Sequence, residues 1–151
     1  MNDQEKTTPH RTGVCIVGGG PAGMLLGLLL AKRGSDVIVL EQHNSFDREF
    51  RGEVLQPSTA RLLDQIGLLG YIMDQPHLTL TEGKLLVNGV PKAGFSFNTI
   101  APNYPYAIWM PQVVFLNALL EKARQFAGFH CWMGAHVKEL IEENSSVVGV
   151  R

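Results

Sequence analysis

The apolar residues near the N-terminus fall into three blocks, whose spacing predicts a strand, a helix and a second strand. Residues 14–17 form a short, partly β-branched apolar run that is typical of a buried strand. Residues 24–31 are apolar on every side, which predicts a helix buried between a sheet and a neighbouring layer. Residues 37–40 form a second apolar run that ends in Glu41. This order predicts an α/β fold built on a βαβ unit with a parallel sheet.

The first strand and the helix are joined by a glycine-rich turn. Gly18, Gly20 and Gly23 have the spacing G-x-G-x-x-G. The first glycine permits a tight turn, the second lets a pyrophosphate approach the backbone, and the third lets the helix pack close to the sheet. Pro21 suits the first helical turn. An anion can be bound there by backbone N–H groups and the positive end of the helix dipole, so no basic side chain is required.

Glu41 lies 23 positions after Gly18, at the end of the second predicted strand. A carboxylate at this distance accepts hydrogen bonds from the ribose 2′ and 3′ hydroxyls of an adenosine. It would repel a 2′-phosphate, which disfavours NADP at this position. The pattern therefore predicts an adenine dinucleotide site, and the alternative is a glycine-rich turn in an ordinary βαβ unit.

A loop and a further helix are expected next. Residues 42–49 are polar and predict a loop, whereas Pro57 opens a segment with apolar residues at helical spacing up to the region of Gly67 and Gly70. The apolar positions of that helix are Leu62, Leu63, Ile66 and Leu69. Arg51 lies in a loop that should return towards the dinucleotide site. It would either contact the cofactor or remain solvated.

The pattern changes at residues 78–100, where two apolar runs flank Asn88 and Gly89. Asn-Gly is a strong signal for a β-hairpin, and Pro91 indicates an edge position. Antiparallel structure next to a parallel core predicts a second layer or domain that begins near residue 75. Residues 101–111 are expected to form a loop. Its aromatic residues, Tyr104, Tyr106 and Trp109, would either line a substrate pocket or pack the loop itself.

The remaining sequence predicts one helix and three strands. Pro111 is expected to open a helix, so that Gln112 lies at its N-terminus, where the side chain would either reach a ligand or be solvated. Its apolar stripe comprises Val114, Leu116, Leu119, Leu120, Ala123 and Phe126. Residues 129–133 predict a strand, and the last residues predict two strands around a turn at Asn144 and Ser145.

Composition narrows the class of protein. The chain has 151 residues, 45% of them hydrophobic, which suits one core, and its net charge of −1 gives no electrostatic case for binding nucleic acid or an anionic membrane. Residues 14–31 contain five glycines and a proline, which argues against a membrane span. We expect Cys15 and Cys131 to be reduced and the protein to be cytoplasmic. Residues 1–12 are polar, so we expect a mobile tail without a secretory signal.

The sequence contains no familiar catalytic or metal-binding motif. The five histidines show no metal-ligand spacing, and a pair formed by His130 and His136 is a weak candidate. There is no G-x-S-x-G nucleophile motif. We therefore predict no metal site and assign no catalytic residue, which suits a protein whose cofactor supplies the reactivity.

Three stretches resemble the N-terminal part of the single-component FAD-dependent aromatic hydroxylases, which include p-hydroxybenzoate hydroxylase and the ubiquinone-pathway hydroxylases. VCIVGGGPAGMLLGLLLAKRGSDVIVLE is similar to their FAD fingerprint, including the small residue Gly27. RGEVLQPSTARLLDQIGL resembles their arginine loop and the following helix, which places Arg51 near the flavin and the FAD phosphates. WMPQVVFLNALLEKA resembles a helix that begins with a glutamine contacting FAD, which places that role on Gln112.

The resemblance implies an FAD-dependent monooxygenase that uses NADH or NADPH to hydroxylate a small aromatic molecule. Other FAD enzymes of the same fold remain alternatives, namely geranylgeranyl reductases, epoxidases and halogenases, as does a non-catalytic module that binds an adenine dinucleotide. The residues expected to bind the cofactor are Gly18, Gly19, Gly20, Pro21, Ala22, Gly23, Glu41, Gln42, Arg51 and Gln112.

The resemblance also implies a domain organisation. Residues 13–75 would form the Rossmann-like FAD-binding βαβ unit and following helix, and 76–110 the start of an antiparallel substrate-domain sheet. Residues 111–151 would return to the FAD-binding domain, with 1–12 as the tail. Members of that family continue with D-G and G-D motifs that are not found here. We therefore expect an N-terminal fragment that does not turn over by itself.

Overall fold

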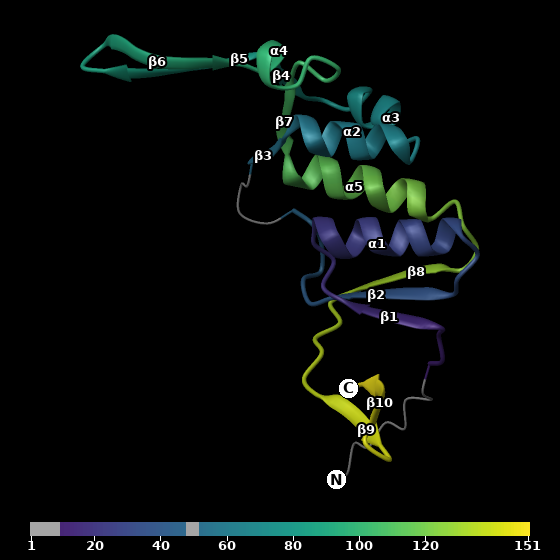
Figure 1. Cartoon of the computed structure of the whole chain (residues 1–151). Coiled ribbons are helices and arrows are strands. Elements are labelled where there is room, and N and C mark those ends of the chain that lie inside the picture. Colours follow the sequence, from purple (N-terminus) through teal and green to yellow (C-terminus); the bar gives the residue numbers. More distant parts are fainter. Residues whose placement is uncertain (1–9, 48–51) are drawn as a thin grey trace. The chain divides into compact units, whose positions relative to one another are not determined.

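The computed structural model describes residues 10–47 and 52–151 (Figure 1). These residues form two compact units: residues up to Ser45 together with Leu120–Arg151 make the first, and Phe46–Leu119 the second. Most of the predicted tail and the predicted loop residue Arg51 lie outside the described residues. The division into an FAD-binding and a substrate-binding part near residue 75 stays a prediction.

The first unit contains the predicted βαβ element (Figure 1). β1 (Val14–Val17) leads into α1 (Pro21–Lys32), and β2 (Val37–Glu41) returns parallel to β1. β2 is the central strand, because β8 (Phe129–Met133) pairs with its other edge, also in parallel. The predicted parallel α/β core is therefore confirmed.

α1 packs on this sheet through one face. Its buried residues are Met24, Gly27, Leu28 and Ala31. Gly27 is required there, because a Cβ would lie 2.8 Å from Val39 Cγ2 and 3.0 Å from Phe129 Cε2. The prediction of burial on every side was wrong for Leu26, which is 48% exposed. The helix covers the sheet with positions spaced three and four residues apart, and Leu26 lies on its opposite face.

Two tight turns of the first unit agree with the sequence. Gly34 has a φ of 85°, and its N–H donates to the carbonyl oxygen of Ala31 over 2.9 Å, so it closes α1 as predicted. Asn144 and Ser145 both adopt a positive φ between β9 (Leu140–Glu143) and β10 (Ser146–Val150), which pair in an antiparallel hairpin. The predicted turn at these two residues is confirmed.

The second unit is mostly antiparallel. Its elements are β3 (Gly52–Leu55), α2 (Pro57–Gln65), α3 (Leu69–Met73), β4 (Leu78–Leu80), β5 (Glu82–Val87), β6 (Val90–Ser96), α4 (Phe97–Ile100), β7 (Ala107–Pro111) and the start of α5 (Gln112–Ala123). β7 is the central strand and pairs with β3 and β4. β5 and β6 form a separate hairpin, in which Asn88 and Gly89 have φ values of 51° and 77°. The predicted Asn-Gly hairpin is confirmed.

Two sequence predictions around β7 need correction. Ala107–Pro111 is the strand β7 rather than part of a loop, because its buried residues Ala107, Ile108 and Met110 belong to the core of the unit. Pro111 ends that strand, so the following helix begins at Gln112.

That helix also ends earlier than expected. α5 stops at Ala123, so Phe126 of the predicted apolar stripe lies beyond the helix. Phe115 was not included in that stripe, but its side chain is buried, with 3% of its surface exposed. No helix within residues 10–47 or 52–151 combines the length and the apolar character needed to span a bilayer.

Candidate functional site

The glycines of the turn between β1 and α1 differ in what the fold requires of them. Gly18 has a φ of 108°, and its N–H donates to the carbonyl oxygen of Leu40 over 2.8 Å, which holds the turn at the end of β2. A Cβ at Gly23 would overlap the carbonyl oxygen of Gly18. At Gly20 the same Cβ would meet nothing within 4 Å. Gly18 and Gly23 are therefore required by the fold, whereas Gly20 leaves an open surface beside the backbone.

The N-terminus of α1 lies at this open surface. Pro21 takes one of the first two helical positions, and the N–H of Met24 is the donor of the first hydrogen bond back to Gly20, over 2.9 Å. Within α1, all of which is described, no acidic residue stands in the first turn and no side chain caps the helix. The first N–H groups of a helix have no partner inside it, so this end suits an anion.

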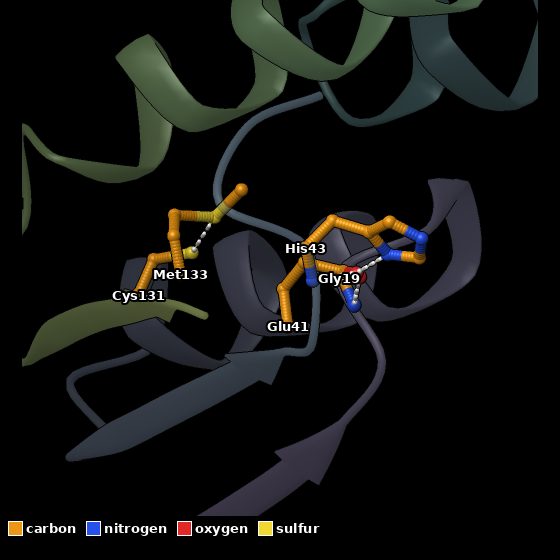
Figure 2. Close-up of polar contacts among 5 residues, drawn as sticks. All are labelled: Gly19, Glu41, His43, Cys131 and Met133. Carbon is orange, nitrogen blue, oxygen red and sulfur yellow. Dashed lines mark hydrogen bonds and ion pairs between the residues drawn. The ribbon is translucent and has the colours of Figure 1, made fainter. Parts of the chain in front are cut away.

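Glu41 connects the end of β2 to the glycine turn (Figure 2). Its side chain is buried, and its Oε2 accepts a hydrogen bond from the N–H of Gly19 over 2.8 Å. A Cβ at Gly19 would lie 2.9 Å from the Cβ of Glu41, so only glycine fits at that position. The Gly19 N–H is thus directed at the carboxylate. Its predicted contact with the cofactor stays a prediction.

His43 is a part of this site that the sequence did not indicate. Its Nδ1 lies 2.6 Å from Glu41 Oε1, and its backbone N–H donates to the same oxygen over 3.0 Å (Figure 2). The histidine side chain is 42% exposed and that of Glu41 is 4% exposed. A histidine two residues after an acid is not a recognised motif, so only the geometry of the turn reveals the pair.

The chain after β8 holds the end of β2 in place. The N–H of Gly134 donates to the carbonyl oxygen of His43 over 2.9 Å, and the N–H of Ala135 donates to that of Glu41 over 2.8 Å. Gly134 has a φ of 72°, which suits glycine at this crossing. The position of the Glu41–His43 pair is therefore fixed from a segment distant in sequence.

The other predicted cofactor residues are distributed as follows. Ala22 lies in the first turn of α1 and is exposed, and Gln42 follows β2 and is also exposed. Gln112 is the first residue of α5 and belongs to the second unit, so its predicted contact stays a prediction. The role of Arg51 falls outside the described residues.

Of the three aromatic residues near β7, Tyr104 makes a contact that favours packing of the loop over lining of a pocket. The Tyr104 hydroxyl donates a hydrogen bond of 2.7 Å to Asp64 Oδ2, which joins the 101–106 segment to α2. This hydrogen bond is the main reason why the pKa of Tyr104 is raised. Trp109 lies on β7 with 41% of its surface exposed. A role in a substrate pocket stays a prediction for Tyr106 and Trp109.

Both cysteines are free. Cys131 lies on β8 with its Sγ 3.8 Å from Met133 Sδ (Figure 2). Burial raises the pKa of the Cys131 thiol, the negative charge of Glu41 also raises it, and the positive charge of Arg124 acts in the opposite direction. Among the described residues, no group of three His, Cys, Asp or Glu side chains could hold a metal ion.

These features fit the adenosine diphosphate part of a dinucleotide. An open backbone surface at Gly20 and the N-terminus of α1 suit a pyrophosphate, and an acid at the adjacent strand end suits a ribose. The residues described here include no further acid or base that stands out at this turn. The arrangement can bind and orient a cofactor.

Comparison with known proteins gives a consistent result. A family model described as an FAD binding domain matches residues 11–151. A 6-methylpretetramide 4-monooxygenase from Streptomyces rimosus is 35% identical over 151 residues, which cover 92% of this chain and 33% of that protein. A 1H-pyrrole-2-carbonyl-(peptidyl-carrier protein) chlorinase from Pseudomonas fluorescens is 43% identical over 63 residues, or 42% of this chain and 14% of that protein.

A solved structure resembles the fold over most of the chain. The crystal structure of p-nitrophenol 4-monooxygenase from Pseudomonas putida superposes with a TM-score of 0.80 and 29% identity, covering 88% of this chain and 34% of that one. The chain therefore spans about a third of the length of the first curated relative and of this crystal structure.

Proposed function

Since the chain belongs to the FAD binding domain family, we propose that its first unit holds the adenosine diphosphate half of FAD in a flavin-dependent monooxygenase. The observation that carries this proposal is the buried Glu41 carboxylate, which is hydrogen-bonded to Gly19 beside the open backbone at Gly20. Glu41 would accept hydrogen bonds from the ribose hydroxyls. The backbone N–H groups of Gly20, Ala22 and Gly23 at the start of α1 would bind the pyrophosphate.

The remaining predicted residues would contact other parts of the cofactor. We assign contacts with the flavin and phosphates to Arg51 and Gln112, and Gln42 would lie near the adenosine. Glu41 would also disfavour a 2′-phosphate through charge repulsion, which supports FAD over NADP at this site. These roles concern binding and orientation only.

The activity of the whole protein would be hydroxylation of a small aromatic molecule. FAD supplies the redox chemistry when bound, with NADH or NADPH as the reductant and dioxygen as the source of the inserted atom. The names of the Streptomyces and Pseudomonas putida relatives, both monooxygenases, support this class. We place the protein in the cytoplasm, with a small aromatic molecule as its substrate.

Calorimetric titration of the 151-residue chain with FAD, ADP and NAD tests the binding proposal. FAD should bind more tightly than ADP if the chain also supports the flavin half. FAD binding no tighter than ADP would instead favour a module that holds only an adenine nucleotide. A chain that binds neither FAD nor ADP would contradict the proposed site.

The reaction is tested on a protein that carries this chain at the full length of its relatives. That protein should purify yellow and should oxidise NADH or NADPH faster when a phenolic compound is present. A colourless protein that does not take up FAD on reconstitution would rule out the proposed activity.

Halogenation is the second candidate, because the chlorinase from Pseudomonas fluorescens matches a 63-residue segment at 43% identity. Labelled dioxygen distinguishes the two reactions in the full-length protein. A hydroxylase transfers one labelled oxygen atom to its product, whereas a halogenase in the presence of chloride or bromide gives a halogenated product without the label.

A further inference from the structure

We propose that His43 is a positioning residue, which fixes the Glu41 carboxylate in the orientation that receives the ribose hydroxyls. This inference rests on the proposed function, because it concerns the adenosine part of the same FAD site. His43 was not among the residues expected to bind the cofactor. It acts on the ligand through Glu41.

Hydrogen bonds from three donors, one of Gly19 and two of His43, restrict the rotation of the carboxylate. The Gly19 N–H donates to Oε2 over 2.8 Å, while the backbone N–H and the Nδ1 of His43 lie 3.0 Å and 2.6 Å from Oε1 (Figure 2). Both carboxylate oxygens are therefore held, one from the glycine turn and the other from the residue two positions beyond Glu41. His43 contributes two of the three contacts.

The chemistry of the carboxylate specifies the protonation of the ring. An ionised carboxylate only accepts hydrogen bonds. With Glu41 ionised, the contact of 2.6 Å places a proton on Nδ1 of His43. Because the backbone of His43 is itself bonded to Gly134 over 2.9 Å, the ring is attached to a residue with a fixed position.

A fixed acceptor improves the binding of the ribose. A glutamate side chain loses rotamer freedom when it is ordered, and a site that is ordered before the ligand arrives does not incur that loss on binding. The Glu41 side chain is almost fully buried and the histidine ring is about half exposed. His43 thus supplies a donor from the solvent side, where water would otherwise compete for Oε1.

Three variants of the 151-residue chain separate this role from a general effect on the fold. His43→Leu removes the side-chain donor at similar bulk. The amide nitrogen of His43→Asn lies at about the position of Nδ1, whereas the amide nitrogen of His43→Gln lies at about that of Nε2. Only His43→Asn should retain the orientation of Glu41, and equal behaviour of the Asn and Gln variants would contradict the proposal.

Titration with ADP and 2′-deoxy-ADP reports on the ribose contact alone. The parent chain should bind ADP roughly tenfold more tightly than 2′-deoxy-ADP, as expected for a hydrogen bond to a charged group. This ratio should fall to about twofold in His43→Leu and His43→Gln and should be retained in His43→Asn. The same ratio in His43→Leu as in the parent chain would overturn the proposal, because a purely structural role would weaken both ligands equally.

Hydrogen exchange at the Gly19 amide tests the positioning without any ligand. In His43→Leu this amide should exchange faster than in the parent chain, since its acceptor Glu41 is less restrained, and His43→Asn should resemble the parent. Unchanged exchange in His43→Leu would overturn the role of His43. A parent chain that binds neither FAD nor ADP would overturn the proposed function and the ribose role with it, while the exchange result would still decide whether His43 holds Glu41.

Discussion

The backbone N–H of Gly19 donates to Glu41 Oε2 over 2.8 Å, so the acid that ends β2 is tied to the turn that follows β1. The two residues also lie in van der Waals proximity, because a Cβ at Gly19 would meet the Cβ and Cγ of Glu41. The acid is therefore a structural part of the turn as well as the proposed ribose ligand. Changing it should affect both stability and binding.

Replacement of Glu41 by glutamine tests both roles. The amide group of the variant cannot accept from all three donors, because one of its two polar atoms is an NH₂ that faces an N–H group. We expect the free energy of unfolding to fall by about 1–3 kcal/mol and the affinity for ADP to fall with it. Denaturant titration and calorimetry measure the two effects. Glu142→Gln, at an exposed position on β9, is the matched control and should change neither.

The glycines of the turn should respond differently to the same substitution. Gly23→Ala places a methyl group on the Gly18 carbonyl, which is backbone and cannot move aside, so we expect a loss of stability of about 3 kcal/mol or more. Gly20→Ala has room for its methyl group and a negative φ of −72°, so its stability should stay within about 1 kcal/mol of the parent.

Gly20→Ala, the substitution that should spare stability, should weaken ligand binding. The methyl group of Gly20→Ala occupies the open surface where the pyrophosphate is proposed to lie, so the folded variant should bind ADP and FAD more weakly. Thermal unfolding and ligand titration of both variants provide the comparison. Parent-like binding by Gly20→Ala would show that no ligand approaches the backbone there.

The sequence was most informative where a structural element depends on neighbouring residues. The βαβ unit follows from apolar runs and glycine spacing within residues 14–41, and the Asn88–Gly89 hairpin follows from the φ angles that those residues readily adopt. Both were predicted correctly, because the residues that cause each element belong to one continuous stretch of the sequence.

Features that depend on distant residues were less predictable. β7 was expected to be a loop, because the Pro- and Tyr-rich residues before it obscured a five-residue strand that is stabilised by β3 and β4. His43 joins the candidate site only because the chain turns after β2 and directs Nδ1 at Glu41. No spacing in the sequence indicates that orientation.

The pair formed by Tyr104 and Asp64 leads to a prediction about tyrosine ionisation. The hydrogen bond to Asp64 is the main cause that raises the pKa of Tyr104, so this hydroxyl should ionise at a higher pH than an ordinary tyrosine. Asp64→Ala removes both the hydrogen-bond acceptor and the negative charge that oppose ionisation, and should move that step to lower pH. Ultraviolet absorbance titration measures the shift, and Tyr104→Phe identifies which step belongs to Tyr104. An unchanged titration in Asp64→Ala would exclude Asp64 as the cause of the raised pKa.

The half-buried thiol of Cys131 makes the stability of the first unit dependent on alkaline pH. Its pKa is raised above the ordinary value of 9.0 mainly by burial, so the folded chain retains the thiol proton at a pH where the unfolded chain releases it. The stability contribution is therefore complete below about pH 9 and is lost as the pH rises through the folded-state pKa.

Denaturant titration at several pH values should show this alkaline loss, and Cys131→Ala should reduce it because alanine does not ionise. Alkylation offers an independent measurement, since only the thiolate reacts. Cys131 should be modified slowly in the folded chain and faster in denaturant at the same pH, which mass spectrometry of the modified peptide can follow. Equal rates in the two states would mean that the fold does not protect this thiol.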